Sequence, residues 1–288
     1  MRLANIVTAV SDILAGIAVA GYVSGRGWDP VPVALLVVAT IGLYGGGVVF
    51  NDVFDAALDR LERPERPIPS GLISRRAAII FGTALLALGI SAASLVHEQG
   101  LLSASGLLAI AIALAALIYD KWSKHHPFLG PLNMGICRGL NLLLGMSIAP
   151  QVLAQYGWIS IVPLIYVAAI TMISRGEVHG GKQITLYGAA FLYAVVMLSI
   201  LWVAADRQAL GIAAVFTALF GLMIFPPLLR AVRQPAGPLI GKAVKAGVLA
   251  LIIMNAAWAS AFGFPYFALV ILLLLPVSLL LAKLFAVT

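Results

Sequence analysis

Ten long apolar segments constrain the fold of this chain more than any other feature. Each is close to the roughly twenty residues that an α-helix needs to cross the hydrocarbon core of a bilayer. Backbone N–H and C=O groups find no water partners in lipid, so a spanning segment must satisfy them internally, as a helix does. The pattern predicts an all-α, polytopic transmembrane helical bundle. The segments lie approximately at residues 4–24, 31–51, 73–96, 101–119, 128–150, 157–175, 185–205, 209–229, 241–262 and 265–285.

Composition excludes the main alternatives to a membrane protein. The 288 residues are 62% hydrophobic and 10% charged, with a mean hydropathy of +1.07, which no soluble domain of this size matches. The chain has a net charge of +7, and in a membrane protein such an excess usually comes from basic residues in the cytoplasmic loops. We therefore expect no nucleic-acid partner. No internal repeat, linker or second domain is visible, and residues 1–288 are therefore expected to form a single transmembrane domain.

The distribution of basic residues predicts the orientation. Of the 18 lysines and arginines, only Arg26 and Arg207 fall on one side of the predicted spans, while Arg138 lies within one. The others share the opposite side, which the positive-inside rule identifies as cytoplasmic. We therefore expect a multi-pass protein, in a bacterial inner (plasma) membrane, with both termini on the cytoplasmic side.

An acidic stretch follows the second segment on this cytoplasmic side. Asp52, Asp55 and Asp59 lie at i, i+3 and i+7, so a continuing helix places all three on one face. Two carboxylates about 6 Å apart repel by roughly 3 kcal/mol at an effective dielectric of about 20. Such a cluster favours a counter-cation, and hard oxygen ligands suit Mg²⁺. The helix is expected to end at Arg63, because Pro64 restricts the backbone of the preceding residue.

The complete stretch resembles the first aspartate-rich signature of the UbiA superfamily of intramembrane prenyltransferases. The family pattern N-D-x-x-D-x-x-x-D-R, followed by R-P-[IL]-x-[ST]-G, is matched by residues 51–60 and 66–71. The resemblance implies a nine-helix bundle, so that 265–285 is an additional C-terminal helix or forms, with the segment before it, one span plus a re-entrant piece. We expect an additional span, because Lys283 then falls on the basic side. The resemblance further implies that Asp52, Asp55 and Asp59 are catalytic and hold Mg²⁺, while Asn51, Arg60 and Arg66 bind substrate.

Other polar residues near the cytoplasmic side are further candidates for substrate binding. The resemblance implies a tyrosine-plus-lysine segment at Lys121 and Lys124, for which ordinary positive-inside flanking is the alternative. Arg138 and Asn141 lie at i and i+3, on one face of the fifth predicted helix. Because a charge at membrane depth is costly, we expect Arg138 to face the cavity and contact substrate; structural pairing with Asp12 is the alternative.

The end of the sixth segment departs from the family pattern. The family has a second acidic motif there, commonly D-x-x-x-D, whereas this chain has Glu177 as the lone carboxylate among Arg175, His179 and Lys182. We expect Glu177 to make one metal contact as a catalytic residue, and the three basic residues to bind phosphate. The string SRGEVHGG at 174–181 resembles the divergent EboC-type branch found in bacterial ebo gene clusters.

The resemblance implies Mg²⁺-dependent transfer of a prenyl group from a polyprenyl diphosphate to a small acceptor. Aromatic rings stabilise an allylic cation over their faces, and Phe50, Tyr119 and Tyr187 are candidates. The acceptor stays open among an aromatic acid, a quinone precursor, a tetrapyrrole and a polyol. Two other functions stay open: a non-catalytic component that binds or transports a lipid diphosphate, and a conventional secondary transporter.

Overall fold

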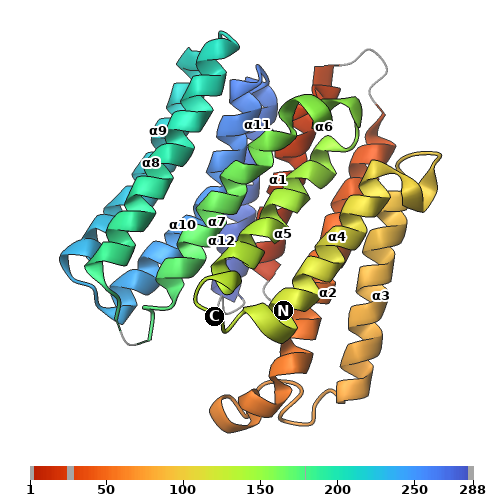
Figure 1. The fold of residues 1–288 in the computed structure, drawn as a ribbon, viewed down its shortest axis with the longest axis vertical. Coiled ribbons are helices and arrows are strands. Elements are labelled where there is room, and N and C mark those ends of the chain that lie inside the picture. The colour runs from red at the N-terminus through yellow and green to blue at the C-terminus, as the bar shows by residue number, and fades with distance from the viewer. Residues whose placement is uncertain (1–2, 25–28, 179, 285–288) are drawn as a thin grey trace.

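The computed structural model describes residues 3–24, 29–178 and 180–284. Within these residues the secondary structure is helical, and the long helices run side by side along one axis (Figure 1). The all-α prediction is therefore confirmed. In chain order the helices are α1 (Leu3–Val19), η1 (Tyr22–Ser24), α2 (Pro30–Glu62), α3 (Arg75–Ser94), η2 (Gly100–Leu102), α4 (Ala104–Ile118), η3 (Tyr119–Ser123), α5 (Leu129–Met146), α6 (Gln151–Tyr156), η4 (Gly157–Ser160), α7 (Ile161–Ser174), α8 (Gln183–Asp206), α9 (Leu210–Arg233), α10 (Gly237–Ala261), α11 (Pro265–Leu272) and α12 (Leu274–Leu284).

The described helices match the ten predicted segments closely. Eight of them, with consecutive helices taken together, are long and apolar enough to cross a membrane. The helix at Ala4–Val19 is apolar but shorter, and α5 carries a buried arginine and asparagine in its middle. The chain is a multi-pass membrane protein.

The last predicted segment is broken into α11 and α12 at Leu273. The sequence predicts a kink at Pro276, and the break lies three residues before it. Proline has no N–H to bond the carbonyl of the residue four positions earlier, here Leu272, and its ring crowds that carbonyl. The helix is therefore interrupted in the turn that precedes the proline.

Helix α2 carries the acidic stretch and ends where expected. Asp29 caps its first turn by accepting a hydrogen bond from the Val31 N–H at 2.9 Å. The helix continues through the acidic residues to Glu62, and Arg63 leaves the helical conformation with φ −146°. The prediction that Pro64 forces this end is confirmed, and the three aspartates lie on one continuous helix.

Glycines on α2 determine how closely α3 approaches. A Cβ added at Gly42 would lie 2.7 Å from the carbonyl oxygen of Leu85 and 2.9 Å from the backbone nitrogen of Gly89, both on α3. Neither backbone atom can move aside cheaply, so the contact requires the small residue. Gly47 faces the opposite way, toward a cavity between α2 and α4.

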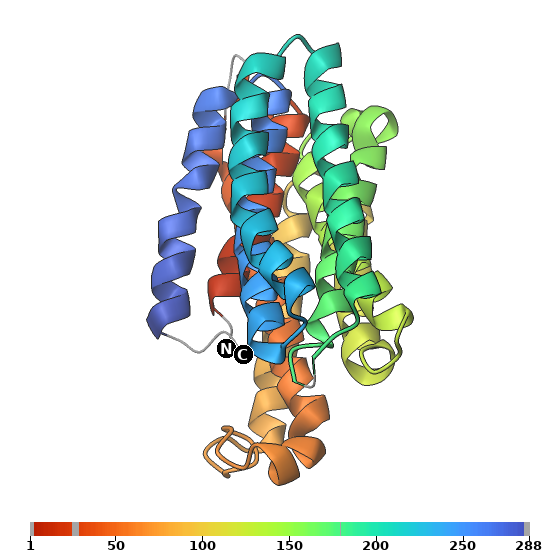
Figure 2. The same ribbon diagram turned by 90° about the vertical axis from the view of Figure 1, so that its left-hand side faces the viewer.

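The bundle has two sides joined by a central pair of helices. Helices α2, α3 and α4 form one side, α8, α9 and α10 form the other, and α1 and α5 lie between them (Figure 1). The connections after α2, η3, α7 and α9 gather at one end of the bundle, together with the start of α1 and the end of α12. Figure 2 shows that the connection between α2 and α3 projects beyond the other helices at this end. The basic residues that the sequence assigns to the cytoplasmic side thus share one end of the bundle. Arg2 of this side and Arg26 of the opposite side lie outside the described residues.

Candidate functional site

A cavity of about 470 Å³ opens at the end of the bundle where α2 finishes. Its walls come from α1, α2, α4, η3 and α5, and the connection after α2 covers its mouth. Charged groups cluster near the mouth, while the middle is apolar. The apolar part is lined by Leu43, Gly47, Val48, Ile112, Ala116 and Met134.

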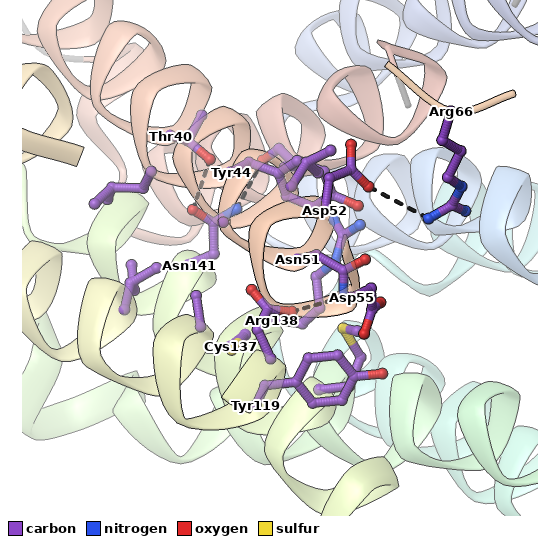
Figure 3. A pocket seen from close by; sticks show the side chains of 18 of the residues that line it. Thr40, Tyr44, Asn51, Asp52, Asp55, Arg66, Tyr119, Cys137, Arg138 and Asn141 are labelled. Atoms are coloured by element: carbon purple, nitrogen blue, oxygen red, sulfur yellow. Dashed lines mark hydrogen bonds and ion pairs between the residues drawn. The ribbon is translucent and has the colours of Figure 1, made fainter. Parts of the chain in front are cut away.

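The acidic face of α2 forms one wall of the mouth. Asn51, Asp52 and Asp55 all line the cavity. Asp52 lies 3.5 Å from the guanidinium of Arg66 (Figure 3). Asp55 pairs with the ammonium group of Lys124. Each of these two carboxylates is therefore neutralised by a basic side chain from another segment.

Asp59 is placed differently from the other two aspartates. It is buried, its carboxylate accepts a hydrogen bond from Arg66 at 2.8 Å, and it does not line the main cavity. Arg66 thus contacts both Asp52 and Asp59, and it ties the covering connection to α2. Asp59 thus faces Arg66 and a smaller hollow that it lines together with Asp55, and its expected role as a metal ligand stays a prediction.

A turn of π-helix at η3 supplies the opposite wall. The N–H of Lys124 donates to the carbonyl of Tyr119 at 3.0 Å, five residues earlier instead of four. This wider turn brings Lys124 to Asp55 and places Tyr119 and Asp120 in the cavity wall. Lys121 is directed away, with its ammonium 4.4 Å from the ring centre of Trp122. Of the two candidate lysines, only Lys124 reaches the aspartates.

Asp120 is a cavity residue that the sequence analysis missed. Its Oδ1 accepts a hydrogen bond from the side-chain amide of Asn51 at 3.0 Å. An acidic residue at the end of an apolar segment was a usable signal. Its direction could not be read from the sequence, because the π-turn shifts the helical register by one residue.

The inner end of the cavity is closed by a buried polar network. Arg138 donates to Asp12 and to the hydroxyl of Thr8, both at 2.9 Å, and its guanidinium lies 5.4 Å from the ring centre of Tyr44. Asn141 donates to Asp12 at 3.1 Å and accepts from Thr40 at 2.8 Å. Arg138 does line the cavity, as expected, but its hydrogen bonds go to α1. Arg138 thus lines the cavity and also has the structural pairing with Asp12, and its contact with substrate stays a prediction.

The residues after α7 are not assembled with this site. Arg175 donates to the carbonyl of His126 at 2.6 Å, and Glu177 is exposed beside the start of α10. Lys182 is exposed at the start of α8, and His179 lies outside the described residues. Among the residues that the structure describes, none from this segment lines the cavity. Arg60 is also exposed and outside it.

The sequence profile of the UbiA prenyltransferase family matches residues 13–237 of the chain, which include every wall of the cavity except part of α1. The chain belongs to this family. The family assignment made from the aspartate-rich signature is therefore confirmed.

Several archaeal members of the UbiA family are similar in sequence. A digeranylgeranylglyceryl phosphate synthase from Methanothrix thermoacetophila is 32% identical over 176 residues, 61% of this chain and 60% of the relative. One from Thermococcus kodakarensis is 35% identical over 137 residues, 46% of this chain and 47% of the relative. The matched region thus spans between about half and three fifths of the length of these relatives.

Solved UbiA homologues share the fold over nearly their whole length. The homologue from Aeropyrum pernix K1, in its apo form, has a TM-score of 0.70 at 21% identity and is covered to 98%, with 89% of this chain. A homologue from Archaeoglobus fulgidus bound to DMAPP and Mg²⁺ has a TM-score of 0.56 at 16% identity and is covered to 99%, with 87% of this chain.

The UbiA-type mouth fits Mg²⁺ in one particular way. No group of three or more His, Cys, Asp or Glu side chains is placed to hold a metal ion within the described ranges. Mg²⁺ does not require such a cage, since one or two carboxylates, waters and substrate phosphates complete its octahedral shell. Asp52 and Asp55 provide carboxylates of this kind at the cavity mouth.

Only one of the three aromatic candidates lies in the UbiA-type cavity. Tyr119 lines it, and Tyr44, which the sequence analysis did not single out, lines it as well. Phe50 packs toward Phe54 and against Gly82 of α3, and Tyr187 is 57% exposed on α8. Phe50 and Tyr187, which the sequence offered as candidates without an orientation, do not line this cavity, because their rings lie on other faces of their helices.

Proposed function

We propose that this UbiA-family protein transfers a prenyl group from a polyprenyl diphosphate to a small acceptor within the membrane, in a Mg²⁺-dependent reaction. The observation that carries the proposal is the division of the cavity. A mouth with two aspartates and two basic residues leads into an apolar chamber. A prenyl diphosphate has the matching division, with an anionic head and a hydrocarbon tail. The solved relative from Archaeoglobus fulgidus binds such a molecule, DMAPP, together with Mg²⁺.

Each of the four charged side chains at the mouth has a role in this reaction. Arg66 and Lys124 exchange their carboxylate partners for phosphate oxygens, which a guanidinium and an ammonium bind as charge-assisted hydrogen bonds. Asp52 and Asp55, released from these pairs, hold Mg²⁺, which when bound stabilises the charge on the leaving diphosphate. The apolar chamber binds the tail and keeps water away from the reacting carbon.

The acceptor is the least defined component. The curated relatives are named as synthases of digeranylgeranylglyceryl phosphate, so a glyceryl phosphate lipid is the first acceptor to test. The polyol, aromatic, quinone-precursor and tetrapyrrole classes follow. Membership of the EboC-type branch stays a prediction, as do the substrate-binding roles of Arg60, Lys121, Arg175, His179 and Lys182 and the metal role of Glu177.

Product formation from radiolabelled geranylgeranyl diphosphate tests the proposal. Purified protein in lipid nanodiscs is expected to convert the label to a prenylated product with Mg²⁺ and to stop when EDTA is added. A non-catalytic carrier predicts Mg²⁺-dependent binding of the label without product. A transporter predicts that sealed vesicles accumulate the label unchanged.

Cysteine labelling tests the proposed orientation in the membrane. Ser70 and Asp206 are both exposed and lie at opposite ends of the bundle. Cys137 is the single cysteine of the chain and is replaced by alanine in both variants. Ser70→Cys is then expected to react with a membrane-impermeant maleimide only in inverted vesicles, and Asp206→Cys only in intact cells. The basic ends of the helices are expected to stay in the cytoplasm. Labelling of both positions from the same side contradicts this topology.

A further inference from the structure

Asp120 is distinguished from the other acidic residues of the cavity by its partners. The residue is 5% exposed, and its Oδ1 accepts one hydrogen bond from the neutral amide of Asn51. Within the described part of the chain it forms no ion pair, whereas Asp52 and Asp55 each have a basic partner. Asp120 is thus a nearly buried carboxylate without a cationic neighbour in contact.

Burying such a carboxylate lowers the stability of the protein, which indicates a role in binding or catalysis. Taking a carboxylate out of water without a cation at hydrogen-bond distance is strongly unfavourable. Ionisable groups at membrane depth typically face a cavity in which they act on a ligand. Asp120 lines the same cavity as the mouth aspartates, so a ligand in this cavity reaches it.

The position of Asp120 along the cavity indicates which part of the ligand it meets. It contacts Asn51, four residues before Asp55 on α2, and α2 runs toward the mouth. One helical turn is about 5.4 Å, so Asp120 lies about one turn deeper than the pair of Asp55 and Lys124. The apolar chamber begins at this level, with Gly47 and Val48 on the next turn of α2.

The bond that breaks in prenyl transfer joins the diphosphate to the tail. With the diphosphate at the mouth and the tail in the apolar chamber, this bond lies at the boundary between them, at the level of Asp120. When the C–O bond breaks, its electron pair leaves with the diphosphate and a positive charge remains on the allylic carbon. That carbon then forms its new bond with an electron pair of the acceptor.

We propose that the Asp120 carboxylate is the counter-charge for this allylic cation. The inference rests on the proposed function and adds a catalytic residue to it. No cation lies within ion-pair distance of Asp120 in the described part of the chain, and the substrate supplies one during the reaction. A preorganised charge at the point where the opposite charge develops is among the largest contributions to catalysis. Its position about one helical turn deeper than Asp55 separates this role from that of a third metal ligand at the mouth.

Binding of a cation analogue tests the proposal without knowledge of the acceptor. The probes are geranylgeranylamine, which is an ammonium ion at neutral pH, and neutral geranylgeraniol, each with Mg²⁺ and inorganic diphosphate. Isothermal titration calorimetry in detergent is expected to give wild-type protein a clear preference for the amine. Asp120→Asn is expected to reduce the ratio of the two affinities by roughly tenfold or more, since a contact between opposite charges is lost. Asp120→Glu, which keeps the charge, is expected to retain most of the preference.

A matched control removes the same charge elsewhere. Asp206→Asn changes an exposed carboxylate at the opposite end of the bundle and is expected to leave the ratio unchanged. A wild-type protein without preference for the amine, or an Asp120→Asn protein that keeps it, overturns the proposal. Failure of the transfer reaction itself is seen separately, in the product assay: a protein that forms no product yet shows the Asp120-dependent preference rejects the reaction and retains the cation site.

Discussion

Asp55→Asn is expected to lower the rate of prenyl transfer by about 1000-fold, the order of effect that follows when a group stabilising transition-state charge is removed. Asp55 lines the cavity mouth, where its carboxylate is available to Mg²⁺ once Lys124 turns to the diphosphate. An amide has no net charge and is a poor ligand for this ion. The ligand-free fold is expected to persist, because the amide oxygen still accepts a hydrogen bond from Lys124.

Two measurements separate loss of chemistry from loss of folding. Single-turnover product formation gives the rate, and thermal melts with and without Mg²⁺ plus prenyl diphosphate give ligand stabilisation. Asp55→Asn is expected to melt near the wild-type temperature without ligand and to gain little stability with it. Glu177→Gln, which changes a carboxylate outside the cavity, is expected to lose far less activity. Equal loss in the two variants argues for a full metal site at Glu177, and an active Asp55→Asn protein argues against the metal role of Asp55.

Arg138→Met is expected to have the largest effect on stability, a loss of about 3–5 kcal/mol, because it leaves a buried carboxylate without its cation. Asp12 has no exposed surface, and it accepts hydrogen bonds from Arg138, Asn141 and Asn255. These donors come from α5 and α10, so the carboxylate joins both helices to α1. The two amide donors that remain cannot neutralise its charge.

Equilibrium unfolding in detergent provides the measurement for Arg138→Met. Adding Asp12→Asn to Arg138→Met removes the uncompensated charge and is expected to restore a large part of the lost stability. Arg207→Met serves as the control, since Arg207 lies over the rings of Tyr156 and Phe262 at the other end of the bundle. Its loss is expected to cost on the order of 1 kcal/mol. A double variant as unstable as Arg138→Met alone contradicts the ion-pair explanation.

Features that depend on local pattern were predictable from the sequence. Apolar runs of sufficient length predicted the spans, because lipid allows a single chain segment to satisfy its backbone only as a helix. Pro64 predicted the end of α2, and the spacing of Asp52, Asp55 and Asp59 predicted a common face. The aspartate-rich signature was sufficient to identify the family, since its residues follow one another without a gap, at the end of α2 and in the connection after it.

The site itself was decided by contacts between distant segments. Asp59 belongs to the acidic pattern, yet its carboxylate is paired with Arg66, because the connection after α2 folds back over that helix. Arg138 and Asp12 are 126 residues apart and meet only because α1 packs on α5. Asp120 reaches the cavity through a π-turn, which a regular 3.6-residue period does not predict. Periodicity determines the face of a helix on which a residue lies, but the packing of helices determines what that face meets, and this depends on the complementarity of surfaces far apart in the chain.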